Sequence, residues 1–262
     1  MDLHTSDGQT LFYETYGDRN GLPVLLLHGL GAEHQMWGPQ FTSYPPLGFF
    51  LIVPDLRGHG LSSVPRHFSL QDCARDMAEL IGKVQLEHCN VVGVSMGGLV
   101  AQLLACDFPG VVSKLVVVDS FSGVSNWRQR ANAWLASFLL AVLPTSLQTR
   151  LLVATYGRMG QPIVAAYFEQ QLGRMDRQLL REMRREINRF DILARLSEIL
   201  APTLVLVGDR FGETAIQMAR RTAQGVARSQ FSVLPGGGDP SNLLVPTAFD
   251  QAVQTFLRRG PR

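Results

Sequence analysis

The stretch that decides the fold is residues 91–98, which read VVGVSMGG. It begins inside an apolar run, 89–94, that has the length and valine content of a buried strand. A helical pattern of apolar residues follows it at 99–108. The glycines on either side of Ser95 leave room for a sharp strand-to-helix turn, which strains the serine and lifts its hydroxyl above the sheet edge. We therefore predict that Ser95 occupies a reactive position.

Apolar runs of strand length alternate with helical patterns along most of the chain. The runs are 11–16, 24–27, 49–53, 89–94, 115–118, 204–207 and 231–234. Helical patterns occupy 70–84, 99–108 and 244–257. Residues 11–16 read as an early strand, and the six runs from 24–27 onward lack polar alternation, which is typical of strands buried on both faces. The alternation predicts an α/β fold, with a mostly parallel sheet covered by helices on both faces.

The alternation stops between residues 121 and 196. This stretch is predicted to be helical, and arginines in its pattern at 175–190 fall mostly opposite the apolar face, toward solvent. We predict a core made of residues 1–120 and 197–262, with 121–196 inserted as a helical cap over the carboxyl edge of the sheet. A chain of 262 residues suits one domain with such an insertion.

The composition excludes several classes of protein. Apolar residues make up 46% of the chain and charged residues 18%, which excludes intrinsic disorder. The net charge of +2 gives no indication of a nucleic-acid partner. The start of the chain has no signal-peptide pattern, and its longest apolar stretch, 131–143, is too short to span a bilayer. We expect a cytoplasmic protein with no membrane partner; the sequence sets no oligomeric state.

No metal or other cofactor is predicted. The three cysteines lack a C-x-x-C spacing, so neither a zinc site nor a disulfide framework is expected.

Two glycine-rich loops follow the first two runs buried on both faces. The first, HGLG at 28–31, can aim the backbone N–H of Leu30 at an oxygen near Ser95, and the N–H of Met96 would be a second donor. Two such donors form an oxyanion hole. The second loop, DLRGHGLS at 55–62, lets the chain leave the sheet edge, and we expect Arg57 and His59 to brace neighbouring loops.

These motifs together resemble the α/β-hydrolase superfamily, in particular its small capped esterases, lactonases and C–C hydrolases. The resemblance covers nearly the whole chain. It rests on HGLG at 28–31, DLRGHGLS at 55–62, GVSMGG at 93–98, PTLVLVG at 202–208 and LPGGGDPSNLLVP at 234–246. It implies an α/β-hydrolase fold, a small-molecule substrate, Ser95 as nucleophile, Leu30 and Met96 as oxyanion donors, and residues 121–196 as the cap.

The chain departs from the family at two of the three triad positions. The family triad runs serine, acid, histidine along the chain, but every histidine here precedes Ser95: His4, His28, His34, His59, His67 and His88. Asp239 stands where the family histidine should be, and Phe211 where the acid should be. A serine needs a base of near-neutral pKa, and aspartate is ordinarily near pKa 3.9. Ordinary ester turnover is therefore disfavoured.

Three groups are candidates to replace the lost base. His34, or less favourably His59, would have to reach Ser95 from an upstream loop. Asp119, after the run 115–118, lies at a sheet-edge position from which a carboxylate can enter the site, unless it only caps the loop. Asp239 can act on the substrate itself if an apolar pocket raises its pKa; otherwise it belongs to a plain turn.

The predicted function follows from these residues. His28, Gly29 and a set of aromatic side chains are expected to line an apolar pocket, although aromatic residues at helical spacing are often core. The aromatic set is Trp37, Trp127, Trp134, Phe138 and Phe211.

We predict an enzyme acting on a small, largely apolar carbonyl compound (an ester, a lactone or a polyketide-like molecule) through Ser95, the oxyanion hole, or both. Lyase, cyclase or isomerase chemistry is favoured over hydrolysis. The alternatives are a non-catalytic ligand-binding protein and a residual fold kept as a structural partner.

Overall fold

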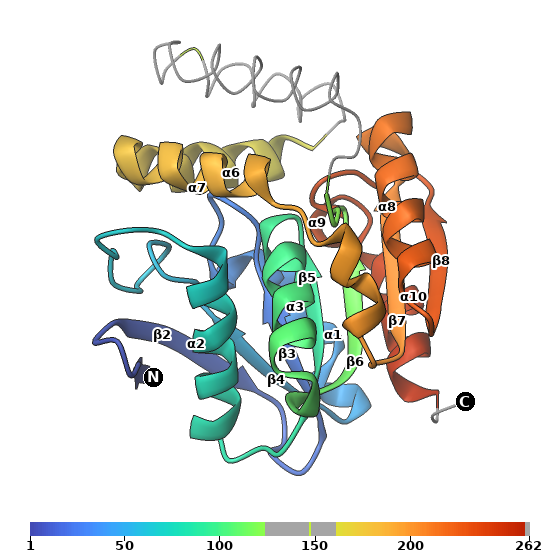
Figure 1. The fold of residues 1–262 in the computed structure, drawn as a ribbon, viewed down its shortest axis with the longest axis horizontal. Coiled ribbons are helices and arrows are strands. Elements are labelled where there is room, and N and C mark those ends of the chain that lie inside the picture. Colours follow the sequence, from blue (N-terminus) through green and yellow to red (C-terminus); the bar gives the residue numbers. More distant parts are fainter. Residues whose placement is uncertain (124–146, 148–160, 260–262) are drawn as a thin grey trace.

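The computed structural model describes residues 1–123, 147 and 161–259. Trp127, Trp134 and Phe138, which were predicted to line the pocket, lie outside these residues. An eight-stranded sheet forms the centre of the molecule, in the order β1-β2-β4-β3-β5-β6-β7-β8 (Figure 1). β1 and β2 run antiparallel to their neighbours, and the other pairings are parallel. This confirms the predicted mostly parallel α/β fold.

Each of the seven apolar runs forms a strand. The strands are β1 (Asp2–His4), β2 (Thr10–Tyr16), β3 (Leu22–Leu27), β4 (Phe49–Pro54), β5 (Cys89–Val94), β6 (Val112–Val118), β7 (Thr203–Gly208) and β8 (Ser229–Leu234). β1 was not predicted, because three residues show no pattern. β8 differs from the expected fully buried strand: Gln230 and Ser232 are exposed, since helices cover this last strand of the sheet incompletely.

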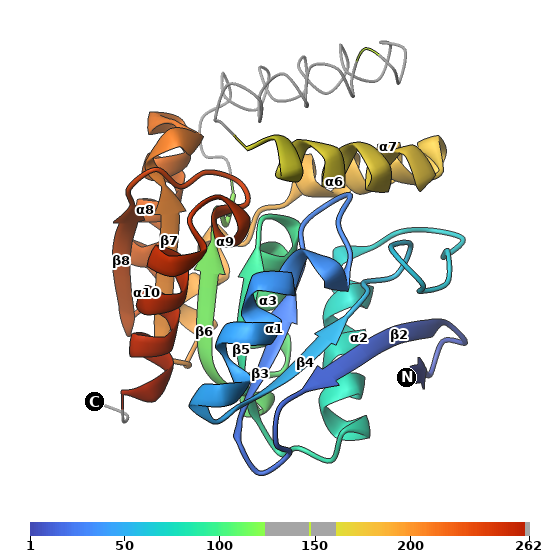
Figure 2. The ribbon, with the colours of Figure 1, turned by 180° about the vertical axis from the view of Figure 1, so that it is seen from behind.

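Helices cover both faces of the sheet, as Figures 1 and 2 show from opposite sides. One face carries α2 (Leu70–Lys83), α3 (Met96–Asp107) and α8 (Glu213–Gly225), and the other carries α1 (Gly38–Ser43) and α10 (Pro246–Arg258). Successive strand residues point to opposite faces, so each strand contributes to two separate cores. The predicted helices at 70–84, 99–108 and 244–257 are confirmed as α2, α3 and α10; α8 was not among them.

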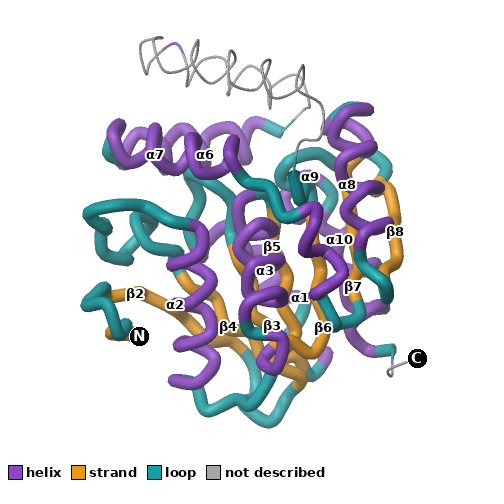
Figure 3. Tube along the Cα trace, in the orientation of Figure 1, coloured by secondary structure: helices purple, strands orange, loops and turns teal. Residues whose placement is uncertain are grey.

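Two further helices lie across the carboxyl end of the sheet, above α2 in Figures 1 and 3. They are α6 (Pro162–Arg174) and α7 (Arg177–Arg189). Asp176 caps α7, because its Oδ1 accepts the Leu179 N–H at 2.9 Å. Leu179 and Met183 of α7 are buried. The limits of the cap, 121–196, stay a prediction, because part of that segment lies outside the described residues.

The remaining short elements are a four-residue helix and five 3-10 turns. They are α9 (Ser241–Leu244), η1 (His34–Trp37), η2 (Pro45–Leu47), η3 (Pro109–Val111), η4 (Leu193–Glu198) and η5 (Asp209–Phe211). Within the described ranges, no helix is both long and apolar enough to cross a membrane.

Candidate active site

Three candidate side chains meet where parallel strands end. Ser95 follows β5 directly, Asp119 follows β6, and Asp239 lies in the loop after β8. The backbone N–H of Ser95 donates to the Val118 carbonyl at 2.9 Å. The hydroxyl of Ser120 donates to the Ser95 carbonyl at 2.8 Å. These two hydrogen bonds hold Ser95 beside the turn after β6.

Ser95 sits in a strained strand-to-helix turn, as the glycine pattern predicts. Its φ of +54° and ψ of −119° lie outside the regions that side-chain-bearing residues ordinarily adopt. The glycines around it are required by space. A Cβ on Gly93 would lie 2.2 Å from the Gly97 carbonyl oxygen, and one on Gly97 would lie 2.2 Å from the Leu27 carbonyl oxygen. The turn therefore presents the Ser95 side chain at the start of α3.

Asp239 is the group that binds the Ser95 hydroxyl. Ser95 Oγ donates to Asp239 Oδ2 at 2.8 Å. The aspartate keeps some exposed surface, yet the surrounding protein displaces most of the water from its carboxyl. This desolvation, followed by the negative charge of Asp119, raises the pKa of Asp239 to about 7, and the hydrogen bond from Ser95 opposes the rise. The carboxyl group thus changes charge near neutral pH.

Asp119 lies beside this pair in a second strained conformation, with a φ of +47°. Only 2% of the surface of Asp119 is exposed to solvent. Oδ1 accepts the Gly208 N–H at 2.8 Å, and Oδ2 accepts the Ser241 N–H at 2.7 Å. Burial raises the pKa of Asp119, and both backbone donors oppose that rise. The sequence carries no signal for these two donors, because every residue but proline has a backbone N–H.

The loop 28–31 lies against Ser95 on the other side. A Cβ built on Gly29 would lie 3.2 Å from Ser95 Cβ and 3.8 Å from Ser95 Oγ. The Ala32 N–H donates to the Gly29 carbonyl at 3.2 Å, and Gly31 has a φ of +70°, which together close a tight turn. Leu30 occupies the tip of that turn, and Met96 is the first residue of α3. The roles of Leu30 and Met96 as oxyanion donors stay a prediction.

His34 is bound to a carboxylate of its own. Its Nδ1 lies 2.9 Å from Asp55 Oδ1, and its Nε2 lies 4.0 Å from a carboxylate oxygen of Glu14. Burial works against the charged ring, but Asp55 raises the pKa of His34 overall. Both ring nitrogens face acids, whereas the Ser95 hydroxyl is bound to Asp239. The expectation that His34 serves Ser95 is therefore corrected: this ring holds the segment after the 28–31 loop to β4.

The other two histidines near the site also brace loops. His28 Nδ1 lies 2.8 Å from the Gly29 carbonyl oxygen, and its Nε2 accepts the Leu56 N–H at 2.9 Å. Burial lowers the pKa of His28. His59 Nδ1 lies 3.2 Å from the Arg57 carbonyl oxygen, and burial, with His28 beside it, lowers the pKa of His59 to about 3. Both rings are therefore neutral at physiological pH.

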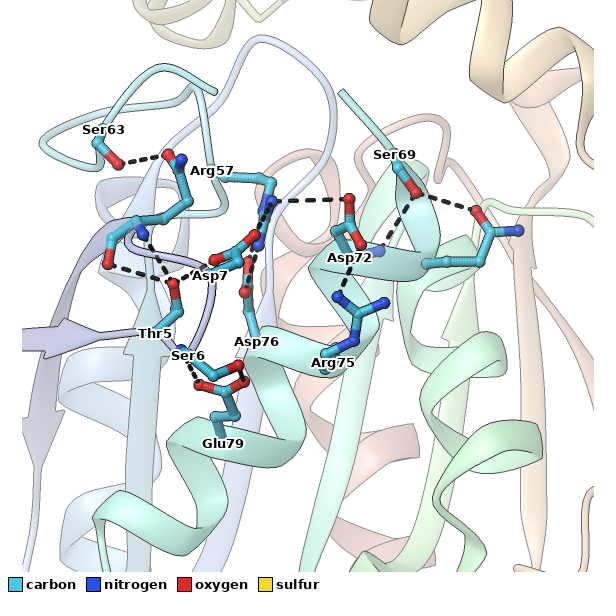
Figure 4. Close-up of polar contacts among 12 residues, drawn as sticks. Thr5, Ser6, Asp7, Arg57, Ser63, Ser69, Asp72, Arg75, Asp76 and Glu79 are labelled. Carbon is cyan, nitrogen blue, oxygen red and sulfur yellow. Dashed lines mark hydrogen bonds and ion pairs between the residues drawn. The ribbon is translucent and has the colours of Figure 1, made fainter. Parts of the chain in front are cut away.

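Arg57 anchors the 55–62 loop, as predicted. Figure 4 shows its guanidinium among three carboxylates, of Asp7, Asp72 and Asp76. Nε donates to one oxygen of Asp76 at 2.7 Å and an Nη donates to the other at 2.5 Å. This two-pronged bond ties the loop to α2, while Asp7 connects it to the turn after β1.

The predicted pocket residues fall in different places. Trp37 has no exposed surface and packs in the core, with its ring 6.1 Å from that of Phe249. Phe211, at the end of η5, is 42% exposed. A cavity of about 160 Å³ lies between the segment 31–33, the loop 58–64 and the α6–α7 junction. Neither Trp37 nor Phe211 lines this cavity.

One cluster brings potential metal ligands together. Among the described residues, Glu33, His34 and Asp55 place ligand atoms within 4.8 Å of one another. Asp55 already accepts three hydrogen bonds from His34 and Leu61, and Glu33 accepts one from Gln171 at 2.7 Å. These hydrogen bonds give both oxygen atoms of Asp55 and one oxygen atom of Glu33 partners within the protein.

Comparisons with known proteins place the chain in a family. Residues 24–252 match the model of the alpha/beta hydrolase family, so the chain belongs to that family. It is 29% identical over 259 residues to a protein of Variovorax paradoxus (strain S110) that carries the name carbamate hydrolase RutD, covering 95% of this chain and 96% of that one. It is 26% identical to 3-oxoadipate enol-lactonase 1 of Acinetobacter baylyi, covering 96% and 94% of the two chains.

Solved structures have the same fold. A hydrolase from Pseudomonas aeruginosa PA01 superimposes with a TM-score of 0.87, at 26% identity and with 99% of this chain and 98% of that chain covered. The enol-lactonase from Burkholderia xenovorans LB400 gives a TM-score of 0.84 at 21% identity, covering 99% and 100%. The family and the fold confirm the α/β-hydrolase resemblance, and an enzyme of the hydrolase class is the expected activity.

Proposed function

We propose that this chain hydrolyses a small, largely apolar ester or lactone, with Ser95 as nucleophile and Asp239 as its base. The observation that supports this most is the 2.8 Å hydrogen bond from Ser95 Oγ to Asp239 Oδ2. A carboxyl group with a pKa of about 7 has the proton affinity of an ordinary histidine. The relatives named as an enol-lactonase and a carbamate hydrolase support a small carbonyl compound as the substrate.

The proposed reaction moves one negative charge and one proton. Ser95 Oγ attacks the carbonyl carbon as its proton passes to Asp239, so the charge moves from the carboxylate to the carbonyl oxygen. The N–H groups of Leu30 and Met96 receive that oxygen. The intermediate then expels the leaving oxygen, which takes the proton from Asp239. Water repeats both steps on the acyl-enzyme, and no charge pair is created, whereas a histidine base would become a cation.

The second candidate is proton-transfer chemistry without an acyl-enzyme, as in a lyase, cyclase or isomerase. It is favoured by the proton that Asp239 retains below a pH of about 7. A neutral carboxyl group beside an oxyanion hole can protonate a bound carbonyl, and its ionised form can remove a proton from carbon. This chemistry needs Asp239 but not the nucleophilicity of Ser95.

Three variants separate the candidates on p-nitrophenyl butyrate and a panel of small lactones. Ser95→Ala and Asp239→Asn are each expected to lose about 10²-fold or more of kcat/KM. Asp209→Asn is the matched control. Asp209 is an exposed aspartate whose carboxylate accepts the backbone N–H of Gly236, in the loop that carries Asp239, at 2.8 Å. This variant should keep the wild-type rate.

Each other result points to a different function. A reaction that survives Ser95→Ala but not Asp239→Asn would replace hydrolysis by the second candidate. Ligand binding without turnover in the wild type would indicate a binding protein instead.

A further inference from the structure

The proposed mechanism leaves a second carboxyl group beside Asp239 without a role. Asp119 follows β6 directly and is almost completely buried. Removing a carboxylate from water without a cation beside it is unfavourable. Its left-handed backbone conformation adds a further cost of about 1–3 kcal/mol. Other interactions of Asp119, or its function, must offset these two free-energy costs.

The backbone contacts of Asp119 converge on the loop that carries Asp239. Ser241, whose N–H binds Asp119 Oδ2, lies two residues after Asp239. Gly208, whose N–H binds Oδ1, packs against that loop, because a Cβ on Gly208 would lie 2.0 Å from the Gly237 carbonyl carbon. The same carboxylate therefore fixes the end of β7 and the start of α9.

Asp119 also stands next to the reacting pair. Its neighbours in the chain, Val118 and Ser120, both hydrogen-bond to the backbone of Ser95. Two backbone donors favour the ionised form of a carboxyl group. A negative charge at Asp119 therefore lies beside the Asp239 loop, and a like charge favours the protonated form of its neighbour.

The polar groups of the neighbouring elements are mostly neutral or exposed. The hydroxyl of Ser95 is neutral, and so is that of Ser241, which donates to the Gly238 carbonyl. His28, in the loop after β3, is kept neutral by burial. Asp209 and Arg210 of η5 are exposed and therefore screened by water. Among these groups, Asp119 is the one whose charge raises the pKa of Asp239.

We infer that Asp119 is the positioning residue for the base Asp239: it holds the Asp239 loop through the backbone N–H groups of Gly208 and Ser241, and it places a negative charge beside that loop. The inference deepens the proposed function and rests on the role proposed there for Asp239. Asp119 itself exchanges no proton with the substrate. The Ser95 proton goes to Asp239 and then to the leaving oxygen, while the Asp119 charge is unchanged throughout.

The direct test is the titration of Asp239, followed by carboxyl-carbon NMR on protein labelled with ¹³C-aspartate. The Asp239 signal is the one that disappears in Asp239→Asn. In Asp119→Asn the pKa of Asp239 should fall by about one unit or more, which is a tenfold or greater loss of proton affinity. In the matched control Asp209→Asn it should stay at the wild-type value. An unchanged Asp239 titration in folded Asp119→Asn overturns the inference, because a residue that only braced the loop would leave that titration in place.

A second variant protects the test against a fold failure. Asparagine at 119 can accept only one of the two backbone N–H groups well, so Asp119→Asn can lose stability. Asp239→Asn leaves both contacts intact. In the wild type the carboxyl-carbon signal of Asp119 should show a second inflection near pH 7, where Asp239 ionises, and this inflection should disappear in Asp239→Asn. A wild-type Asp119 signal without that second inflection would also overturn the inference.

This readout is independent of any substrate. The expected titration shifts without esterase activity would sink the proposed hydrolysis alone. Normal Ser95-dependent activity with unshifted titrations would sink the inference alone.

Discussion

Asp55 and Asp239 lie at the same edge of the sheet, but their pKa values are shifted in opposite directions. Asp55, directly after β4, has no exposed surface and Asp239 is half-buried, yet Asp55 is the stronger acid. Burial works to raise the pKa of Asp55, but the His34 ring, His28 and the N–H groups of Leu61 and His34 lower it overall. At Asp239 desolvation and then the charge of Asp119 raise the pKa to about 7, against the opposing hydrogen bond from the Ser95 hydroxyl.

The difference teaches that the neighbouring charges and donors, and not burial alone, decide what a carboxyl group in this molecule can do. The chain does contain an aspartate–histidine pair, Asp55–His34, but it braces the 28–31 loop instead of serving the serine. The serine is bound to Asp239, whose pKa is raised by desolvation and by the charge of Asp119. Asp55 contributes to the stability of the fold, whereas Asp239 is proposed to accept a proton from Ser95.

The largest expected effect comes from removing each carboxylate charge in turn. Asp239→Asn should lower kcat/KM for p-nitrophenyl butyrate about 10²- to 10⁴-fold without lowering the free energy of unfolding at neutral pH, because it removes a carboxylate that is unfavourable in the folded chain there. Asp55→Asn should lower the free energy of unfolding by about 2–4 kcal/mol, because an amide cannot replace a carboxylate that accepts three hydrogen bonds. Esterase assays and urea unfolding of both variants measure this. Equal losses of activity in the two variants would contradict the assignment of Asp239 to the reaction and of Asp55 to stability.

A smaller effect is expected from rebuilding a histidine base. Asp239→His combined with Phe211→Asp should raise Ser95-dependent hydrolysis of p-nitrophenyl butyrate about 10- to 10²-fold, because an imidazole acts as base without repulsion from Asp119. Phe211 is 42% exposed, so its replacement should cost little stability. Asp239→His alone tests whether Asp119 can orient the new ring. A folded double variant with no gain that Ser95→Ala removes would count against the position assigned to Asp239.

Asp239 and Asp55 should contribute to the free energy of unfolding with opposite dependence on pH. Because the pKa of Asp239 is raised in the folded chain, its contribution is present at about pH 4 and is lost as the pH rises through about 7. Its expected size is about 1–3 kcal/mol. Because the pKa of Asp55 is lowered, its contribution is present above about pH 4 and is lost as the pH falls below that.

Urea unfolding between pH 4 and pH 8 measures the first of these contributions. Asp239→Asn should remove much of the decline in stability between pH 4 and pH 7, although Asp119 contributes to the same decline. A decline of the same size in Asp239→Asn and wild type would show that Asp239 titrates as an ordinary aspartate.

The smallest effect is expected at Gly29. A methyl group there would lie 3.2 Å from Ser95 Cβ, so Gly29→Ala should push the loop away and reduce the rate of Ser95 acylation about three- to tenfold. Gly110→Ala is the matched control, since nothing lies within 4 Å of the position of its added carbon. Pre-steady-state release of p-nitrophenol compares the two. Identical rates would place the oxyanion donors elsewhere.

The sequence predicts this fold and part of this site for physical reasons that differ between residues. The apolar runs predict the long strands, because strands with helices on both faces must be apolar throughout. The glycines around Ser95 predict its turn, because each one prevents a backbone clash. α8 was not predicted, because its apolar face is narrow: only Ala219, Thr222 and Ala223 are buried.

The partners of the site residues could not be read in the same way. Asp119 is held by the backbone of Gly208 and Ser241, and a backbone N–H has no sequence signature. His34 is only 21 positions from Asp55 and 61 from Ser95, but residue types alone do not show that it pairs with the former. Choosing among several chemically suitable partners requires the three-dimensional arrangement of the loops.

The most direct test of the central claim is the rate at which a fluorophosphonate labels Ser95 as a function of pH, followed by intact mass. In the wild type the rate should rise with pH and level off through an inflection near pH 7, the pKa of Asp239. In Asp239→Asn labelling should be about 10²-fold slower or more, with no such inflection. Labelling of Asp239→Asn at the wild-type rate, or a wild-type rate without an inflection between pH 6 and pH 8, would contradict the account.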